Sequence, residues 1–295
     1  MQRRTVQPAE LGKWNNVLEK VLSFESDGES LIGILSQPAQ ASSVAVLILV
    51  GGPQYRIGSH RQFVSLARAL ARSGVAAFRF DFQGMGDSSG ALHDFEHHGT
   101  DIQSAIDVVM AAVPALTGVV LWGLCDAASA ALLYVNERRD SRVQGLVLVN
   151  PWVRSEQSLA DAQLGFYYKR RILQPDFWKK LFAGKISWRA LIEWGGKLLA
   201  TQASASAGQH GSFQQRMAHG WRDFLGAILL ISAGADLTAH EFDGALETQT
   251  DWQGSMNRAR LTRVRISNAD HTFSRREHQN QLESETISWV QELAQ

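Results

Sequence analysis

The chain has 295 residues and carries 29 basic and 29 acidic side chains, so its formal net charge at pH 7 is zero. Such a chain has no overall electrostatic attraction for nucleic acid or for an anionic membrane surface. Its hydrophobic share of 45% and charged share of 20% are typical of a globular protein. The one cysteine excludes an internal disulfide framework. The free thiol, with no signal-peptide core and no apolar run of membrane-spanning length, leads us to expect a soluble cytoplasmic protein.

In chain order, the first predicted elements are two short strands, residues 21–24 and 30–35, which form a hairpin around Asp27 and Gly28. Further on, apolar runs typical of strands buried on both faces alternate with segments of helical spacing. We expect strands at residues 44–50, 75–80, 119–122, 145–149, 227–232 and 261–266. We expect helices at residues 61–72, 101–113 and 277–293, and another directly after Cys125. This alternation predicts an α/β fold with a mostly parallel central sheet and helices on both faces.

The alternation stops once, between Pro151 and Arg222, where we find only amphipathic helical patches rich in aromatic residues. We therefore expect an α/β core formed by residues 1–150 and 223–295, with an inserted helical cap at residues 151–222. The aromatic and basic residues of the cap have two interpretations. They form amphipathic helices that pack on the core, or they line an apolar acyl tunnel with a basic rim. The second would suit an anionic acyl carrier, such as acyl carrier protein or coenzyme A.

The segment after strand 119–122 is the most informative stretch of the sequence. It reads Gly123-Leu124-Cys125-Asp126-Ala127 and runs directly into a helix of small residues. This is the pattern of a nucleophile elbow with cysteine in the place of the usual serine. The turn needs small residues because the nucleophile sits in a strained conformation between strand and helix. The alternative is a buried cysteine that acts only as a small hydrophobic residue.

Two further polar residues follow strands of the predicted sheet. Asp236 comes after strand 227–232, and His271 comes after strand 261–266. Open parallel sheets bind ligands beyond the carboxyl ends of their strands, and the chain order cysteine, aspartate, histidine is that of the α/β-hydrolase nucleophile, acid and base. Alone, Asp236 is explained as a turn or helix cap and His271 as a surface residue. Three such residues at strand ends in this order favour a catalytic triad.

The expected roles follow from that order. His271 would take the proton of Cys125 and later protonate the leaving group, and Asp236 would orient the ring of His271. The backbone N–H of Asp126 would be one oxyanion donor. The side chain of Asp126 would place negative charge near the thiolate, or would serve only as a favourable first-turn helix residue.

The second oxyanion donor is expected in the loop after strand 44–50. Pro53 has no N–H, so Gly52 is the better donor and Gln54 the reserve. The alternative interpretation of this loop is that its glycines only make a turn.

Three residues are candidates for substrate binding: Tyr55, Arg56 and Trp152. Tyr55 and Arg56 would hold a polar or anionic substrate group, or would lie at the surface without such a role. We expect no metal and no cofactor. The glycine-rich run at residues 84–90 lacks the Gly-Lys-Ser/Thr of a phosphate-binding loop, and the histidines within residues 93–98 match no known metal-ligand spacing.

These motifs resemble those of the α/β-hydrolase superfamily. Three longer runs, residues 50–63, 123–130 and 150–154, resemble more narrowly the type 1 hydrolase associated with the exosortase A system. The resemblance extends over nearly the whole chain. It implies a Gram-negative genomic setting of exopolysaccharide production and protein sorting. The sequence departs from the wider superfamily at Cys125, at Ala127 in place of the second elbow glycine, and at Gln83, where an arginine is common.

The sequence thus predicts an esterase or thioesterase that acts through Cys125, His271 and Asp236. A thioester is attractive as a substrate because attack by cysteine on a thioester is a near-balanced exchange. One alternative is an acyltransferase that passes the acyl group to a sugar of an exopolysaccharide precursor. Another is a catalytically idle hydrolase fold that serves as a binding or assembly partner. No motif points to a nucleic-acid partner.

Overall fold

A computed structural model of the chain describes residues 9–14, 17–52, 54–154 and 211–295. Its strands are β1 (Ala9–Trp14), β2 (Val17–Ser26), β3 (Glu29–Gln37), β4 (Val44–Leu49), β5 (Ala76–Phe80), β6 (Gly118–Leu124), β7 (Val143–Val149), β8 (Ala227–Ala233) and β9 (Leu261–Ile266). Its helices are α1 (Gln62–Arg72), α2 (Gly99–Ala112), α3 (Asp126–Arg138), α7 (Phe213–Asp223), α8 (Leu237–Thr248) and α9 (Arg276–Leu293). Short 3₁₀ turns lie at Ser59–Arg61, Phe95–His97, Thr250–Trp252 and Ser255–Asn257.

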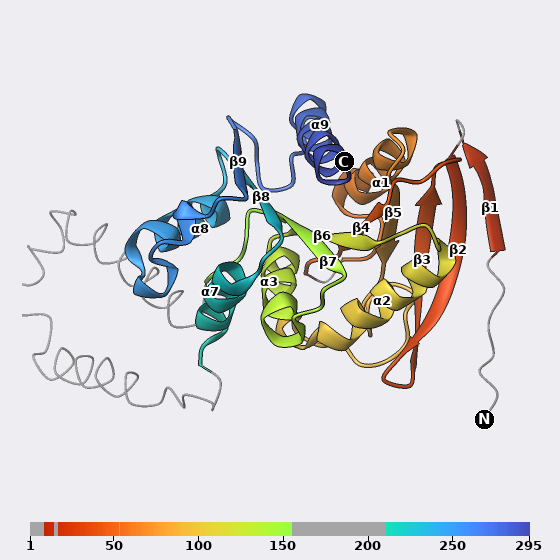
Figure 1. The fold of residues 1–295 in the computed structure, drawn as a ribbon, viewed down its shortest axis with the longest axis horizontal. Coiled ribbons are helices and arrows are strands. Elements are labelled where there is room, and N and C mark those ends of the chain that lie inside the picture. The colour runs from red at the N-terminus through yellow and green to blue at the C-terminus, as the bar shows by residue number, and fades with distance from the viewer. Residues whose placement is uncertain (1–8, 15–16, 53, 155–210) are drawn as a thin grey trace, which may run out of the picture. The chain divides into compact units, whose positions relative to one another are not determined.

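The strands form one sheet in the order β1-β2-β3-β5-β4-β6-β7-β8-β9 (Figure 1). The pairings from β1 to β5 along this order are antiparallel, and those from β5 to β9 are parallel. The hairpin between β2 and β3 closes with Ser26 opposite Glu29. Asp27 and Gly28 between them have φ angles of 47° and 84°, and a two-residue turn with both φ angles positive is type I′. The α/β-hydrolase fold expected from the sequence, with its mostly parallel sheet, is confirmed.

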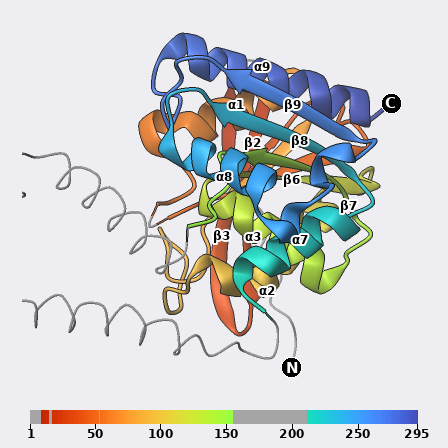
Figure 2. The ribbon, with the colours of Figure 1, turned by 90° about the vertical axis from the view of Figure 1, so that its left-hand side faces the viewer.

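Helices cover both faces of the sheet, as two perpendicular views show (Figures 1 and 2). On one face, Phe63 of α1 and Trp289 of α9 belong to a buried apolar cluster with residues of the parallel strands. On the other face, Ile106 of α2, Leu132 of α3 and Trp221 of α7 belong to a second cluster. All residues of β4 and β6 are buried. Strands covered on both sides need apolar residues at successive positions, which explains their continuous apolar runs.

The antiparallel part of the sheet is larger than the sequence analysis predicts. β2 begins at Val17 and β3 extends to Gln37, and β1 adds a strand at the sheet edge. In β2, buried residues are interspersed with partly buried ones. An antiparallel strand with one face toward solvent carries polar residues that weaken the apolar signal used to find it.

The core also extends further at the end of the insertion than we expect from the sequence. One compact unit consists of Met1–Val153 and Phe213–Gln295, and the second of Arg154–Ser212. Thus α7, which the sequence analysis assigns to the cap, belongs to the core. Met217 and Trp221 lie one helical turn apart and are fully buried, and the indole N–H of Trp221 donates to the Ser255 carbonyl at 2.9 Å. Residues 155–210, most of the expected cap, lie outside the described residues.

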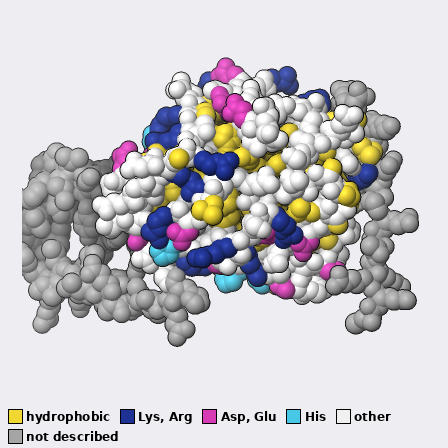
Figure 3. Space-filling model, viewed as in Figure 1, with side chains coloured by type: hydrophobic (Ala, Val, Ile, Leu, Met, Phe, Trp, Pro, Cys, Tyr) yellow, Lys and Arg dark blue, Asp and Glu magenta, His cyan; other side chains and the backbone are white. Residues whose placement is uncertain are grey.

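The surface carries charges of both signs. On the face shown in Figure 3, Lys and Arg side chains are interspersed with Asp and Glu side chains, in line with the zero net charge of the sequence. Among the helices of the described residues, none combines the length and the apolar character that crossing a membrane requires.

Candidate active site

Cys125 lies at the sharp turn between β6 and α3, with φ 64° and ψ −125°. A positive φ is unusual for a residue with a side chain, and such a conformation costs about 1–3 kcal/mol. The turn is fixed by backbone hydrogen bonds, because the N–H of Cys125 donates to the Val149 carbonyl at 2.9 Å and its carbonyl accepts from the Trp152 N–H at 3.2 Å. The strain is therefore held at the carboxyl end of the sheet by the neighbouring strand β7 and the loop that follows it.

Gly123 allows the elbow to close. A Cβ atom at this position would lie 2.5 Å from backbone atoms of Ala127 and Ala128 in the first turn of α3. Backbone atoms in a helix cannot yield to such a contact. The small residue that the motif requires before the nucleophile is thus explained by the close approach of strand and helix.

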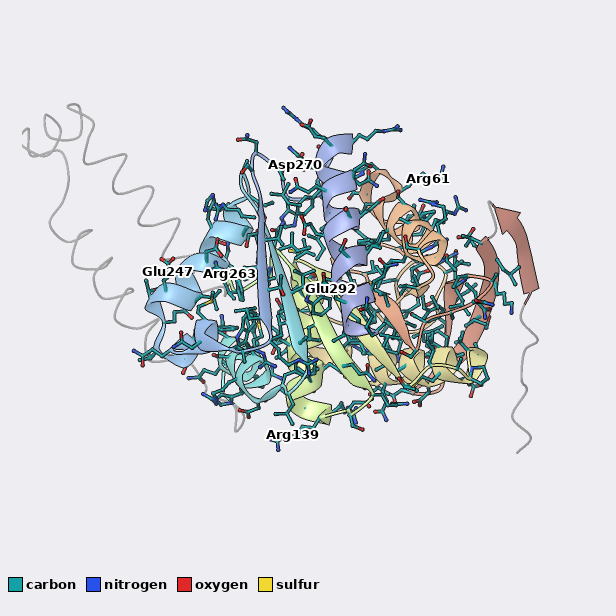
Figure 4. The ribbon with its side chains drawn as sticks, turned by 45° about the horizontal axis from the view of Figure 1, so that its top comes forward. Arg61, Arg139, Glu247, Arg263, Asp270 and Glu292 are labelled. Carbon is teal, nitrogen blue, oxygen red and sulfur yellow. The ribbon has the colours of Figure 1, made fainter. Side chains whose placement is uncertain are left out.

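His271 and Asp236 come from two other strand ends and meet beside Cys125. Asp236 follows β8 and caps α8, where its carboxylate accepts from the N–H groups of Thr238 at 3.3 Å and Ala239 at 3.2 Å. His271 lies in the loop between β9 and α9, next to Asp270, which Figure 4 labels in that loop. Nδ1 of His271 is 2.8 Å from Oδ2 of Asp236.

The charges of this group are coupled. The hydrogen bond that His271 donates to Asp236, followed by its interaction with the side chain of Cys125, raises the pKa of His271 to about 10 although burial acts against it. Burial alone would raise the pKa of Asp236, but the hydrogen bond and the charge of His271 outweigh it and hold that pKa below its ordinary value. The ring of His271 therefore has its pKa raised by two neighbours, the carboxylate of Asp236 and the side chain of Cys125.

The loop after β4 brings Gly52 next to the elbow. The N–H of Gly52 donates to both carboxylate oxygens of Asp126, at 2.9 Å and 2.8 Å. The N–H of Gln54 donates to the carbonyl of Gly52 at 2.7 Å. Gly52, the preferred donor of this loop, and Gln54, the reserve, both line the pocket of Cys125, and in this structure the N–H groups of both have acceptors within the protein.

A pocket of about 330 Å³ opens above the elbow. Its described lining residues are Gly51, Gly52, Gln54, Phe63, Phe95, Leu124, Cys125, Asp126, Trp152 and His271. Phe63, Phe95, Leu124 and Trp152 are its apolar lining residues, and Cys125, Asp126 and His271 bring polar groups to it. A pocket with apolar walls and few converging polar groups is typical of a small-molecule site.

Of the three candidate substrate-binding residues, Trp152 lines this pocket, and Tyr55 and Arg56 are not among its described lining residues. Tyr55 is 45% exposed. The guanidinium of Arg56 forms ion pairs with Asp81 and with Asp87, the latter at 2.6 Å. Asp81 is completely buried, and a buried carboxylate needs such a partner. Arg56 thus neutralises a core charge and does not belong to the described lining of the pocket.

Two residues that hold the His271 loop are missed by the sequence analysis. The side chain of Asn150, fully buried at the end of β7, accepts from the Ala233 N–H at 2.8 Å and donates to the His271 carbonyl at 3.2 Å. Nε2 of His60 lies 3.0 Å from the carbonyl of Thr272. A signal for Asn150 was present, since it is a polar residue directly after a buried strand. The partners of His60 are distant in sequence and leave no such signal.

The search for a metal site concerns the described residues. No group of three or more His, Cys, Asp and Glu residues within the described part of the chain could hold a metal ion. His97 pairs with Asp94 at 2.6 Å. His98 stacks on Phe82 with ring centroids 3.8 Å apart, and burial lowers its pKa to about 4. Both histidines therefore have structural partners.

Comparisons with known proteins agree with the fold. The chain aligns at high probability with the Pyrococcus furiosus esterase Pf2001 (TM-score 0.64, 14% identity, 98% of each chain covered). It is also similar to Est1E of Butyrivibrio proteoclasticus, determined with ferulic acid bound (TM-score 0.59, 16% identity, 92% of this chain and 98% of that one). A Rhizomucor miehei esterase gives a TM-score of 0.60 at 19% identity, with 96% of this chain and 85% of that one covered. At these identities the likeness concerns the fold.

None of the curated proteins matches the sequence. The family model described as "Serine aminopeptidase, S33" matches residues 41–194, which include the loop after β4 and the elbow. This match spans more than half of the 295 residues. The chain therefore belongs to the serine aminopeptidase S33 family and is a hydrolase of the α/β-hydrolase superfamily.

Proposed function

We propose that this protein is a cysteine-dependent hydrolase that cleaves an acyl ester or thioester. The observation that carries the proposal is the grouping of three side chains: Cys125 at a strained elbow, His271 in the same pocket, and Asp236 with Oδ2 at 2.8 Å from Nδ1 of His271. This is the nucleophile–base–orienting acid arrangement of covalent acyl transfer.

In the proposed reaction the sulfur of Cys125 attacks the acyl carbon as a thiolate, which a neighbouring imidazolium favours. A carbon–sulfur bond forms, and the electron pair of the carbonyl π bond moves to oxygen. When the tetrahedral intermediate collapses, His271 protonates the leaving alcohol or thiol. The neutral ring then takes a proton from water, which attacks the thioester and releases the acid.

The pocket and the related structures support this substrate class. Phe63, Phe95, Leu124 and Trp152 line the pocket, so an apolar acyl group fits it better than a polar one. Two of the proteins of similar fold, from Pyrococcus furiosus and Rhizomucor miehei, are named esterases. The family is named for serine, whereas this chain has Cys125 at the elbow. A cysteine nucleophile favours a thioester substrate, because exchange of one thioester for another is near-balanced. A role in exopolysaccharide production and protein sorting rests on the sequence resemblance alone.

The test is intact-mass spectrometry after brief exposure to p-nitrophenyl esters and N-acetylcysteamine thioesters of increasing acyl length. We expect an acyl adduct on Cys125, absent in Cys125→Ala and strongly reduced in His271→Ala. Cys125→Ser is the matched control, because it keeps the elbow and exchanges only the nucleophilic atom. Addition of sugar acceptors distinguishes hydrolysis from acyl transfer. If the wild-type thiol is alkylated by iodoacetamide and yet neither it nor any variant forms an acyl adduct, the proposal is wrong.

A further inference from the structure

Asp126 follows the nucleophile directly, and its carboxylate turns back toward the loop after β4. Both of its oxygens accept from the N–H of Gly52, at 2.9 Å and 2.8 Å. The carboxylate lines the pocket together with Cys125 and His271. A charged side chain that could point to solvent is thus held inside the site.

The loop is shaped to accept this carboxylate. A Cβ atom at Gly51 would lie 2.2 Å from Oδ1 of Asp126 and 2.7 Å from the Leu124 carbonyl. Gly51 therefore leaves the space that the carboxylate fills. The position of Asp126 has two independent supports, the donated N–H of Gly52 and the absent side chain of Gly51.

The N–H of Gly52 lies where enzymes with a nucleophile elbow place a donor for the oxyanion. In α/β-hydrolases the oxyanion is held by the N–H of the residue after the nucleophile and by an N–H of the loop after the corresponding strand. Those positions are Asp126 and Gly52 here. The carboxylate of Asp126 accepts the N–H of Gly52 as an oxyanion would, so the carboxylate and the oxyanion cannot both use this donor.

We propose that the carboxylate of Asp126 occupies the oxyanion site of the resting enzyme, and that a substrate carbonyl reacts only after displacing it. Rotation about the Cα–Cβ bond of Asp126 frees the N–H of Gly52 for the substrate oxygen. Asp126 is therefore a gating residue, whose removal exposes a preformed oxyanion site. This inference rests on the proposed attack by Cys125.

If Asp126 fills the oxyanion site, its removal should favour addition of the Cys125 sulfur to a carbonyl over alkylation of the same sulfur. Addition to a carbonyl forms a carbon–sulfur bond and creates an oxyanion, which needs the site that Asp126 fills. Alkylation by iodoacetamide forms a carbon–sulfur bond and expels iodide without any oxyanion. A change at Asp126 that only altered the reactivity of the sulfur would affect both reactions in the same proportion.

The experiment compares the wild type with Asp126→Ser, Asp126→Asn and Glu277→Ser. Glu277 is the matched control, because it is an acidic residue in the first turn of α9 and lies outside the described pocket lining. For each protein we would measure the affinity for a short alkyl trifluoromethyl ketone, which forms an anionic hemithioketal on cysteine, and the rate of alkylation by iodoacetamide. Thermal unfolding shows that each variant is folded.

We expect the ratio of ketone affinity to alkylation rate to rise about 10- to 100-fold in Asp126→Ser, as when a charge-assisted hydrogen bond no longer competes. Asp126→Asn should give a smaller rise, because an amide oxygen still accepts from Gly52 but lacks the charge. Glu277→Ser should leave the ratio unchanged. A ratio that stays constant or falls in both Asp126 variants overturns the inference. If esters acylate the wild type but the ratio is the same in the Asp126 variants, the gate is overturned and the proposed function stands. If the Asp126 variants bind the ketone more tightly but no ester or thioester acylates the protein, only the proposed function is overturned.

Discussion

Replacement of Asn150 tests whether one buried amide positions His271, the proposed base. Its side chain joins the ends of two strands to the His271 loop: the oxygen accepts from the Ala233 N–H at 2.8 Å, and the nitrogen donates to the His271 carbonyl at 3.2 Å. Asn150 is fully buried and has a φ of 45°. Asparagine tolerates this backbone conformation better than most residues. Two roles are therefore combined in one residue, a hydrogen-bonding role and a conformational one.

The magnitude follows from the groups left unpaired. Asn150→Ala leaves the buried Ala233 N–H without a partner, which costs about 1–3 kcal/mol, and the lost bond to the His271 carbonyl adds roughly 1 kcal/mol. We therefore expect a loss of about 2–4 kcal/mol in the free energy of unfolding. For a core of this size that loss corresponds to a decrease in Tm of roughly 5–15 °C.

Asn150→Gly separates the two roles, because glycine accepts a positive φ without strain but makes neither side-chain hydrogen bond. Thermal unfolding followed by circular dichroism gives the stability of both variants, and the rate of Cys125 acylation gives the effect on the site. We expect both variants to be destabilised and to acylate more slowly, since the His271 loop loses an anchor. An Asn150→Gly variant with the wild-type Tm would refute the reasoning, because the conformational role alone would then explain the residue.

Three other predictions concern Gly123 at the elbow, His271, and Arg56 in the loop after β4. Gly123→Ala places a Cβ 2.5 Å from helix backbone, so we expect a loss of about 3 kcal/mol or more in unfolding free energy, measured with urea. The pKa of His271 is raised from 6.5 to about 10, so its stabilising contribution is complete below pH 6.5 and disappears as the pH rises through about 10. Its ring is 36% exposed, and screening reduces the size of this effect. Urea unfolding across this range should show a decline that is smaller in Asp236→Asn; equal slopes would contradict the assignment. Arg56→Met leaves the buried carboxylate of Asp81 unpaired and should cost about 3–5 kcal/mol, measured with urea, whereas the KM for a neutral ester should stay the same; a large rise in KM would instead assign Arg56 to substrate binding.

The sequence predicts the parallel part of the fold well, because strands buried on both faces must be apolar along their length. β4 and β6 illustrate this, since every residue in them is buried. It also predicts which residues meet at the sheet edge, because parallel strands all end there. Cys125, Asp236 and His271 are far apart in the chain and yet follow strands β6, β8 and β9, and the structure places them side by side.

The sequence analysis fails where a contact depends on one side chain in an otherwise polar segment. α7 looks like part of the cap because most of its residues are polar, but two buried side chains, Met217 and Trp221, fix it to the core. Arg56 looks like a substrate ligand because it follows the oxyanion loop. Its actual partner, Asp81, lies 25 residues later, and no local pattern connects a cation to a carboxylate at that distance.

Asp126 shows why a motif can be identified while its chemistry stays open. In the sequence its side chain has two interpretations, a negative charge that opposes the thiolate and a favourable residue for a helix start. In the structure Asp126 begins α3, and its carboxylate accepts the N–H of Gly52 from the loop after β4. Burial raises its pKa even though this hydrogen bond opposes the shift, so the carboxylate is held at a cost in solvation. A charge kept in a pocket against that cost is more consistent with a group that must be displaced during the reaction than with a helix cap, for which an exposed acid such as Glu277 suffices.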